Sequence, residues 1–103
     1  MKRAVRSALL LLCLSWANLA WADEKVTIWW AQWEPAAALQ ELGNDFEAET
    51  GIAIEVKQIP WPSYQDQVFL NFGNNKTDFD IVIGDSQWIG RGATKGLYLE
   101  LTD

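Results

Sequence analysis

Three short apolar runs alternate with longer amphipathic segments along this sequence, and the alternation restricts the possible folds more than any other feature. The runs cover residues 26–31, 52–56 and 79–84 and are rich in β-branched and aromatic residues, a composition typical of strands. In the first two segments that follow, apolar residues recur at spacings of three and four, as on one face of a helix. Strands that alternate with helices predict an α/β domain, with a parallel sheet and helices on both faces.

The first expected helix covers residues 35–50, with Pro35 in its first turn and Gly51 as the left-handed residue that ends it. Gly43 inside this helix indicates a close approach to the sheet, because glycine costs about 1 kcal/mol there relative to alanine. The expected buried face of this helix consists of Ala38, Leu39, Leu42, Gly43 and Phe46.

The strand at 52–56 alternates apolar and polar residues, which predicts a position near a sheet edge. We expect Ser63 to cap the following helix, with Asp66 three residues later and Gly73 at its end. Its buried stripe is expected to contain Tyr64, Val68, Phe69 and Phe72. After the third strand, Asp85 or Ser86 is expected to cap a short helix at 87–95, which Gly96 ends.

Residues 1–22 have the layout of a secretory signal. Lys2, Arg3 and Arg6 precede the apolar run 8–14, and the small-residue pattern at 20–22 follows it. We expect cleavage after Ala22 and export to the periplasm, with a retained membrane anchor as the alternative. The uncharged stretch is shorter than the roughly 20 apolar residues that span a bilayer, so we expect no stable anchor.

The 81 residues after this signal contain no Cys and no His, since Cys13 is the only cysteine. This composition excludes disulfides, Cys/His zinc sites and Cys or His nucleophiles from the mature chain. Five basic residues against 14 acidic ones give it a net charge of −9. Nucleic acid and anionic lipid are therefore unsuitable partners.

Tryptophan is unusually frequent, with five residues in the mature part, and several lie where strands end. Loops after the carboxyl ends of parallel strands are where ligands bind in open α/β sheets. Aromatic faces there pack on the C–H face of a sugar, while acids and amides bind its hydroxyls. The candidate ligand-binding residues are Gln32, Trp33, Glu34, Trp61, Tyr64, Asp85, Ser86, Gln87 and Trp88.

Several of these residues also have a purely structural interpretation. Trp29 and Trp30 point to opposite faces of one strand, and we expect Trp29 to be core. Trp88 could pack back on the sheet, and Asp85 could serve only as a helix cap. Glu34 suits the first turn of a helix in any case.

A catalytic role has little support in the sequence. Glu34 and Asp85 could form a glycosidase carboxylate pair, but their separation is not defined by the sequence. No GxSxG, P-loop or GxGxxG motif is present. Asp78 and Asp80 precede the third strand, at the other end of the sheet, and we expect turn and solubility roles for them.

Four segments together resemble the N-terminus of extracellular solute-binding proteins of bacterial ABC importers, in particular the sugar-binding, maltose-binding-protein-like group. The segments are VTIWWAQWEP, LGNDFEAETGIAIEV, DFDIVIGD and GLYLELT. The resemblance implies a periplasmic-binding-protein-like type II fold, of which residues 23–103 form an incomplete N-terminal lobe without the second lobe. It also implies a monomer that needs no cofactor, binds a small-molecule solute in a cleft and delivers it to an ABC permease.

Carried onto this chain, the resemblance places ligand contacts at residues 32–34 and 85–88, with Trp61 and Tyr64 as a further contribution. A carbohydrate is the leading ligand hypothesis. A cationic amine caged by Trp faces and Asp85, a stand-alone envelope glycan-binding module and a glycoside hydrolase fragment remain as alternatives.

Overall fold

The structure is a computed structural model that describes residues 24–102. The expected signal at 1–22 and its cleavage site lie outside the described residues. Within residues 24–102, no helix combines the length and apolar character needed to cross a membrane.

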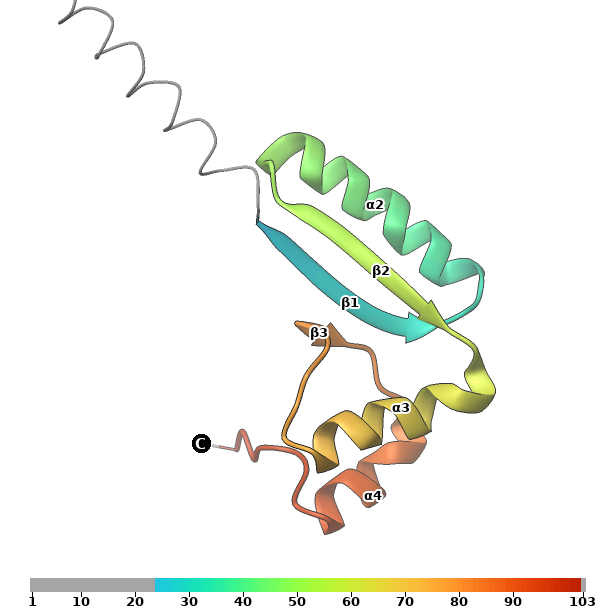
Figure 1. Cartoon of the computed structure of the whole chain (residues 1–103), viewed down its shortest axis with the longest axis vertical. Helices are drawn as coiled ribbons and strands as arrows, with labels where there is room; N and C mark the ends of the chain where they lie inside the picture. Colours follow the sequence, from blue (N-terminus) through green and yellow to red (C-terminus); the bar gives the residue numbers. More distant parts are fainter. Residues whose placement is uncertain (1–23, 103) are drawn as a thin grey trace, which may run out of the picture.

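The described chain forms a three-stranded parallel sheet between helices, as the alternation of apolar runs predicts (Figure 1). The strands lie in the order β2-β1-β3, so β1 is central and β2 is an edge strand. In chain order, the elements are β1 (Lys25–Ala31), α2 (Glu34–Thr50), β2 (Ala53–Ile59), α3 (Trp61–Gly73), β3 (Ile81–Val82), the 3-10 helix η1 (Ser86–Trp88) and α4 (Ile89–Thr94).

Each face of the sheet has its own apolar core, because successive side chains of a strand point to opposite faces. On the α2 side, Ile28 and Val56 of the strands pack with Ala36 of the helix. The larger core on the α3 side consists of Trp29, Ala31, Ile59, Tyr64, Val68, Phe69, Phe79 and Trp88. Trp29 is 3% exposed, which confirms its expected core position.

Helix α2 has the predicted extent, and its expected buried face is correct for Leu39 and Gly43 but not for its other members. Gly51 ends it with a φ of 77°, and its N–H donates to the carbonyl of Glu47 over 2.7 Å. Gly43 is buried against Ile54, which confirms the close approach to the sheet. The expected burial of Leu42 and Phe46 is wrong, since 64% and 44% of these side chains are exposed.

The reason is that small residues, rather than the larger apolar ones, set the contact between α2 and the sheet. Ala36 is fully buried and Gly43 lies seven residues later, on the same face of the helix. This pair lets the helix lie close to β2. Ala38, Leu42 and Phe46 are rotated away from the sheet and remain exposed in the described part of the chain.

Helix α3 begins three residues earlier than expected, at Trp61, with Pro60 preceding it. Ser63 is therefore a first-turn residue and not the cap, and its hydroxyl donates to the carbonyl of Pro60 over 3.2 Å. Proline in the first turn fixes the helical φ and needs no N–H partner there, which explains a start without a side-chain cap. The predicted burial of Tyr64, Val68 and Phe69 is confirmed.

The third strand is shorter than the apolar run 79–84, because only Ile81 and Val82 pair with β1 as a regular strand. Hydrogen bonds from Asp80 N to Thr27 O and from Ile83 N to Trp29 O extend the contact at each end. Ile81 is 48% exposed, so β3 is only partly buried.

After β3, the helical segment begins and ends at the residues expected to cap it. Asp85 Oδ1 accepts a hydrogen bond from Gln87 N over 2.8 Å, which makes Asp85, and not Ser86, the capping residue. Gly96 follows α4 with a φ of 65°. In the tail beyond it, Leu97 is half-buried, whereas Leu99 and Leu101 are each 83% exposed.

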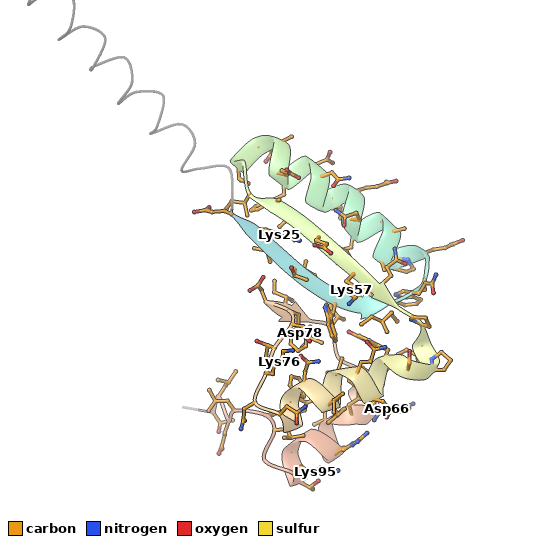
Figure 2. The ribbon with its side chains drawn as sticks, viewed as in Figure 1. Lys25, Lys57, Asp66, Lys76, Asp78 and Lys95 are labelled. Atoms are coloured by element: carbon orange, nitrogen blue, oxygen red, sulfur yellow. The ribbon has the colours of Figure 1, made fainter. Side chains whose placement is uncertain are left out.

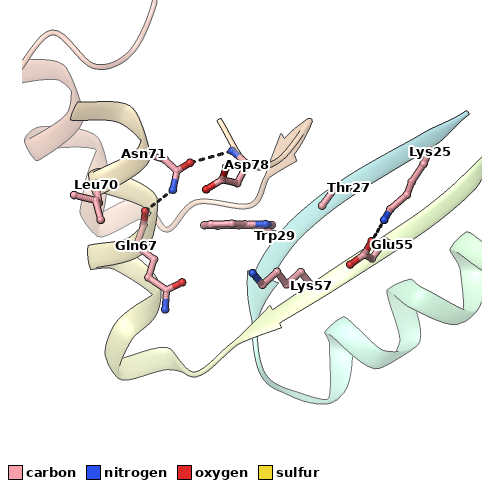
Figure 3. A pocket seen from close by; sticks show the side chains of 9 residues that line it. All are labelled: Lys25, Thr27, Trp29, Glu55, Lys57, Gln67, Leu70, Asn71 and Asp78. Atoms are coloured by element: carbon pink, nitrogen blue, oxygen red, sulfur yellow. Dashed lines mark hydrogen bonds and ion pairs between the residues drawn. The ribbon is translucent and has the colours of Figure 1, made fainter. Parts of the chain in front are cut away.

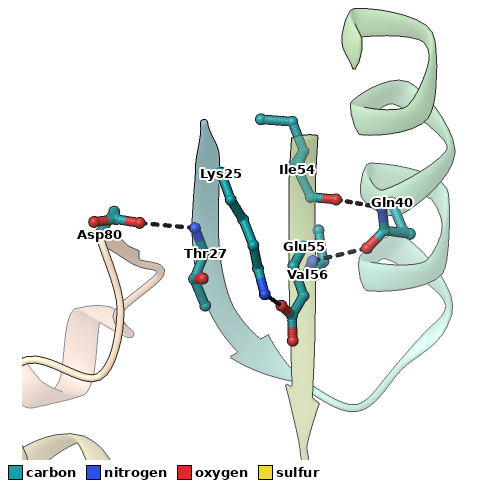
Figure 4. A network of polar contacts seen from close by, with 7 residues as sticks. All are labelled: Lys25, Thr27, Gln40, Ile54, Glu55, Val56 and Asp80. Atoms are coloured by element: carbon teal, nitrogen blue, oxygen red, sulfur yellow. Dashed lines mark hydrogen bonds and ion pairs between the residues drawn. The ribbon is translucent and has the colours of Figure 1, made fainter. Parts of the chain in front are cut away.

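Polar side chains tie the amino-terminal half of the sheet together (Figure 4). Asp80 Oδ2 accepts a hydrogen bond from Thr27 N over 2.9 Å, and Lys25 forms an ion pair with Glu55. On the outer side of β2, the Gln40 side chain binds Ile54 O and Val56 N over 2.8 and 2.7 Å. Asp80 thus binds the backbone of the central strand, a role beyond the turn and solubility roles expected of it.

Candidate functional site

A cavity of about 260 Å³ opens at the carboxyl ends of the strands. Trp30 and Ala31 end β1, Trp61 begins the helix after β2, and Ile83 follows β3. The cavity therefore lies at the position where open parallel sheets bind ligands. Its lining residues are Trp30, Ala31, Trp33, Trp61, Tyr64, Ile83, Gly84 and Asp85.

Aromatic rings form two groups in and beside this cavity. The rings of Trp30 and Trp33 meet edge to face, with centroids 5.3 Å apart and an interplanar angle of 87°. Trp61 lies nearly parallel to Trp88, at 6.2 Å and 20°, and is tilted against Tyr64 at 6.4 Å. Trp33 and Trp61 are 53% and 54% exposed, so large parts of their rings are available to a ligand.

Backbone contacts at the strand ends fix both exposed tryptophans. Gln32 N donates to the carbonyl of Ile59 over 2.8 Å, which holds the end of β1 beside the end of β2. Trp33 is the extended residue before α2, and its carbonyl accepts from Ala36 N over 3.1 Å. Trp61 is held in the first turn of α3 and is not a loop residue as expected.

Asp85 both caps η1 and lines the cavity. Its Oδ1 is used by the N–H of Gln87, which fixes the orientation of the carboxylate. An oriented carboxylate beside aromatic faces can accept hydrogen bonds from hydroxyl or ammonium groups. The capping role is confirmed, whereas ligand contact by Asp85 stays a prediction.

Tyr64 lies under the cavity and is only 1% exposed. Its hydroxyl lies 2.9 Å from the carbonyl oxygen of Trp29 and 2.6 Å from that of Ile83. Burial raises the pKa of this phenol to about 12, against the smaller, opposing effect of the hydrogen bond to Ile83. Tyr64 is therefore neutral at physiological pH.

The other predicted ligand residues do not line this cavity. Gln32, Glu34, Ser86 and Gln87 have exposed side chains beside it. Trp88 is 3% exposed and packs in the core against Tyr64 and Phe69, at 5.2 and 5.9 Å. Trp88 thus adopts the packing position that its sequence context also allowed. The cavity brings together Trp33, Trp61, Tyr64 and Asp85 from the segments that follow the three strands.

Sequence reasoning did not select Trp30, Ala31, Ile83 and Gly84 as lining residues. For Trp30 a signal was available, because it follows a buried Trp29 and must point to the opposite face at the end of the strand. Ile83 and Gly84 gave no such signal, since they belong to an apolar run that predicts only a buried strand.

A larger hollow, of about 470 Å³, lies between α3 and the face of β1 and β2 (Figure 3). Charged and amide side chains dominate its lining, including Lys25, Glu55, Lys57 and Asp78, and Lys25, Lys57 and Asp78 lie along the space between the sheet and α3 (Figure 2). Trp29 is the one aromatic side chain among its lining residues, with Lys57 Nζ 5.0 Å from the centroid of its ring. We select the smaller cavity, because it combines several aromatic faces with a position at the strand ends.

Across residues 24–102, no group of three or more acidic, His or Cys side chains could hold a metal ion. The expectation that the protein needs no cofactor stays a prediction.

Comparison of the sequence with known protein families gives a match. Residues 30–103 match the bacterial extracellular solute-binding protein family. The chain belongs to this family. The match covers all three candidate loops and confirms the resemblance seen in the sequence. Family membership assigns solute binding outside the cytoplasm as the role of the protein. A comparison with proteins of curated function finds no match.

Proposed function

We propose that this chain is part of the substrate-binding component of an ABC importer and captures a carbohydrate at the cavity lined by Trp30, Trp33 and Trp61. In this proposal, residues 23–103 are the N-terminal part of the first lobe, and the solute is enclosed between this lobe and a second one. The protein acts as a monomer in the periplasm after cleavage behind Ala22, and a membrane permease receives the solute.

The single observation that supports this proposal best is the convergence of aromatic faces and a carboxylate in one cavity at the strand ends. Three indole rings, each with an N–H donor, surround a space of about 260 Å³. A pyranose packs its C–H face on an indole and offers hydroxyl protons to a carboxylate such as Asp85. The net charge of −9 in the mature chain agrees with a neutral rather than an anionic solute.

A cationic amine is a second candidate, which the same cavity favours by a different chemistry. An ammonium group gains from the faces of Trp30, Trp33 and Trp61 through cation–π contacts and from the charge of Asp85. A sugar needs Asp85 only as a hydrogen-bond acceptor, whereas an amine needs its charge. A substitution that removes only the charge of Asp85 therefore distinguishes a sugar from an amine.

The test is a titration of the protein that carries this chain with neutral sugars and with polyamines, followed by tryptophan fluorescence. Asp85→Asn keeps an oxygen that can cap η1 but removes the charge. Asp66→Asn, at an exposed position on α3 (Figure 2), is the matched control.

We expect saturable binding of a sugar, weakened several-fold at most by Asp85→Asn and unchanged by Asp66→Asn. Binding of polyamines alone, abolished by Asp85→Asn, would replace the sugar by a cationic amine. A protein that binds neither class would contradict the proposal. Release of reducing sugar ends that depends on Glu34 and Asp85 would instead indicate a hydrolase.

A further inference from the structure

The Tyr64 side chain contacts the backbone of β1 and of the segment just after β3. The walls of the cavity continue from these two segments. It lies in the first turn of α3, and its ring packs beside those of Trp61 and Trp88, with centroid distances of 6.4 and 5.2 Å. The side chain is 1% exposed. A solute can therefore reach at most a small part of this ring.

The Tyr64 hydroxyl lies within hydrogen-bond distance of two backbone carbonyls. Trp29 O, on β1, is 2.9 Å away, and Ile83 O, just after β3, is 2.6 Å away. A phenol has one proton to donate, so it cannot give a full hydrogen bond to both. The two carbonyls therefore share this proton, with the shorter contact, to Ile83 O, as the stronger component, because Trp29 O also accepts from Ile83 N over 3.0 Å.

The two carbonyls lie where the cavity begins. Trp30 and Ala31 follow Trp29 and form one wall, and Gly84 and Asp85 follow Ile83 and form another. Regular pairing of β3 with β1 ends at Val82. One more backbone hydrogen bond, from Ile83 N to Trp29 O, follows Val82, and beyond it the hydroxyl of Tyr64 takes the place of a further strand hydrogen bond and holds the two walls at a set distance.

We propose that Tyr64 is a positioning residue of the solute site, whose hydroxyl fixes the segments Trp30–Ala31 and Gly84–Asp85 relative to each other. The inference rests on the proposed function of this cavity. It changes the role expected of Tyr64, because the hydroxyl is used within the protein and the solute binds without it. Without that hydroxyl, the carbonyl of Ile83 loses its donor and the wall that carries Asp85 gains freedom.

Tyr64→Phe tests this role, because it keeps the ring and removes only the hydroxyl. Tyr98→Phe is the matched control, since Tyr98 is 38% exposed and lies outside the cavity lining. Two readouts are compared in the protein that carries this chain: the affinity for the sugar that wild type binds, and amide hydrogen exchange without any ligand.

We expect Tyr64→Phe to weaken sugar binding about tenfold and to speed amide exchange selectively at residues 83–87, while Tyr98→Phe matches wild type. Unchanged affinity and exchange in Tyr64→Phe would overturn the inference. An equal acceleration of exchange at all core amides would also overturn it, since it would show a role in global stability only.

A wild-type protein that binds no sugar would contradict the proposed function, while the exchange experiment would still test the tie between the walls. Where Tyr64→Phe does not fold, NMR of wild type provides the test. A Tyr64 hydroxyl proton that exchanges slowly with water is expected, and one that exchanges as fast as that of Tyr98 would overturn the inference.

Discussion

At the scale of single residues, Gly43 shows how one missing side chain sets the distance between a helix and a strand. A Cβ at this position would lie 2.7 Å from Ile54 Cγ2 and 2.8 Å from Ile54 Cβ. These atoms are near the backbone of β2 and cannot move away easily. The sequence already indicated this contact, because a glycine inside a helix has a conformational cost that close packing explains.

Gly43→Ala is expected to lower the free energy of unfolding by about 1–3 kcal/mol, because the overlap with Ile54 outweighs the gain in helix propensity. Urea denaturation measures this change. Gly90→Ala is the control, since a Cβ there has no neighbour within 4 Å. If Gly43→Ala proves as stable as Gly90→Ala, the close approach of α2 to β2 is wrong.

The buried phenol of Tyr64 makes stability depend on pH in the alkaline range. Its pKa is raised from 10.0 to about 12, mainly by burial, so the folded state retains the proton more strongly than the unfolded state does. The resulting stabilisation is fully present below pH 10 and is lost as the pH rises to 12. It amounts to about 3 kcal/mol for two pKa units.

We therefore expect the free energy of unfolding of wild type to fall between pH 10 and 12 more steeply than that of Tyr64→Phe. Other titrating groups contribute equally to both proteins, so the difference between the two curves isolates Tyr64. Parallel curves would show that this phenol is not buried in the folded state.

At the scale of elements, the outer edge of β2 is covered by one side chain of α2. Gln40 Nε2 donates to the carbonyl of Ile54, and Gln40 Oε1 accepts from the N–H of Val56. The primary amide thus binds β2 as the peptide group of a neighbouring strand would (Figure 4). An edge strand that is covered in this way is a poorer template for association with another chain.

Gln40→Ala is expected to lower the free energy of unfolding by about 1–3 kcal/mol, because Ile54 O and Val56 N both lose their partner. It is also expected to increase self-association, which sedimentation measures. Gln40→Glu keeps an acceptor for Val56 N but no donor for Ile54 O, and an intermediate effect is expected. Glu41→Ala, at an exposed neighbouring position, should behave as wild type. An equal effect of Gln40→Ala and Glu41→Ala would refute this role of Gln40.

Element types and order could be predicted from the sequence more reliably than the exact bounds of β2, α3 and β3 or the buried faces. Glycines after helices and apolar runs act locally, so Gly51, Gly96 and the central strand were assigned correctly. The face of α2 was assigned only in part, because spacing alone places Gly43 on one stripe with Leu42 and Phe46 and does not show that the helix turns toward Ala36. The small residues define the contact, and their importance appears only when the helix lies on the sheet.

The candidate site could likewise be predicted only in part from the sequence. Trp33, Trp61 and Asp85 were correctly placed at one end of the sheet, because parallel strands bring their carboxyl ends together. The burial of Trp88 and the two carbonyl contacts of Tyr64 depend on how η1 and α3 pack in three dimensions. No spacing rule contains that information.

At the scale of the whole molecule, large apolar side chains remain exposed around the sheet of the described residues. They include Leu42, Phe46, Ile81, Ile89, Leu99 and Leu101. A three-stranded sheet in fewer than 100 residues also buries a small share of its unfolded surface. Both features agree with the proposal that residues 23–103 are part of a larger lobe.

We expect residues 23–103, produced alone, to unfold over a broad range of urea concentration and to self-associate. The measurement is urea denaturation followed by circular dichroism, together with sedimentation. A sharp two-state transition of a monomer would favour the alternative of a stand-alone glycan-binding module.

The most direct test of the central claim is calorimetric titration of the protein that carries this chain with the sugar that it binds, in variants of the two hollows. Trp33→Ala and Trp61→Ala each remove an exposed ring from the aromatic cavity, and Lys57→Ala and Leu70→Ala alter the larger hollow. The proposed site predicts that each tryptophan variant weakens binding by at least tenfold, while the other two bind as wild type does. Undiminished binding in Trp33→Ala and Trp61→Ala, with a loss in Lys57→Ala, would contradict it.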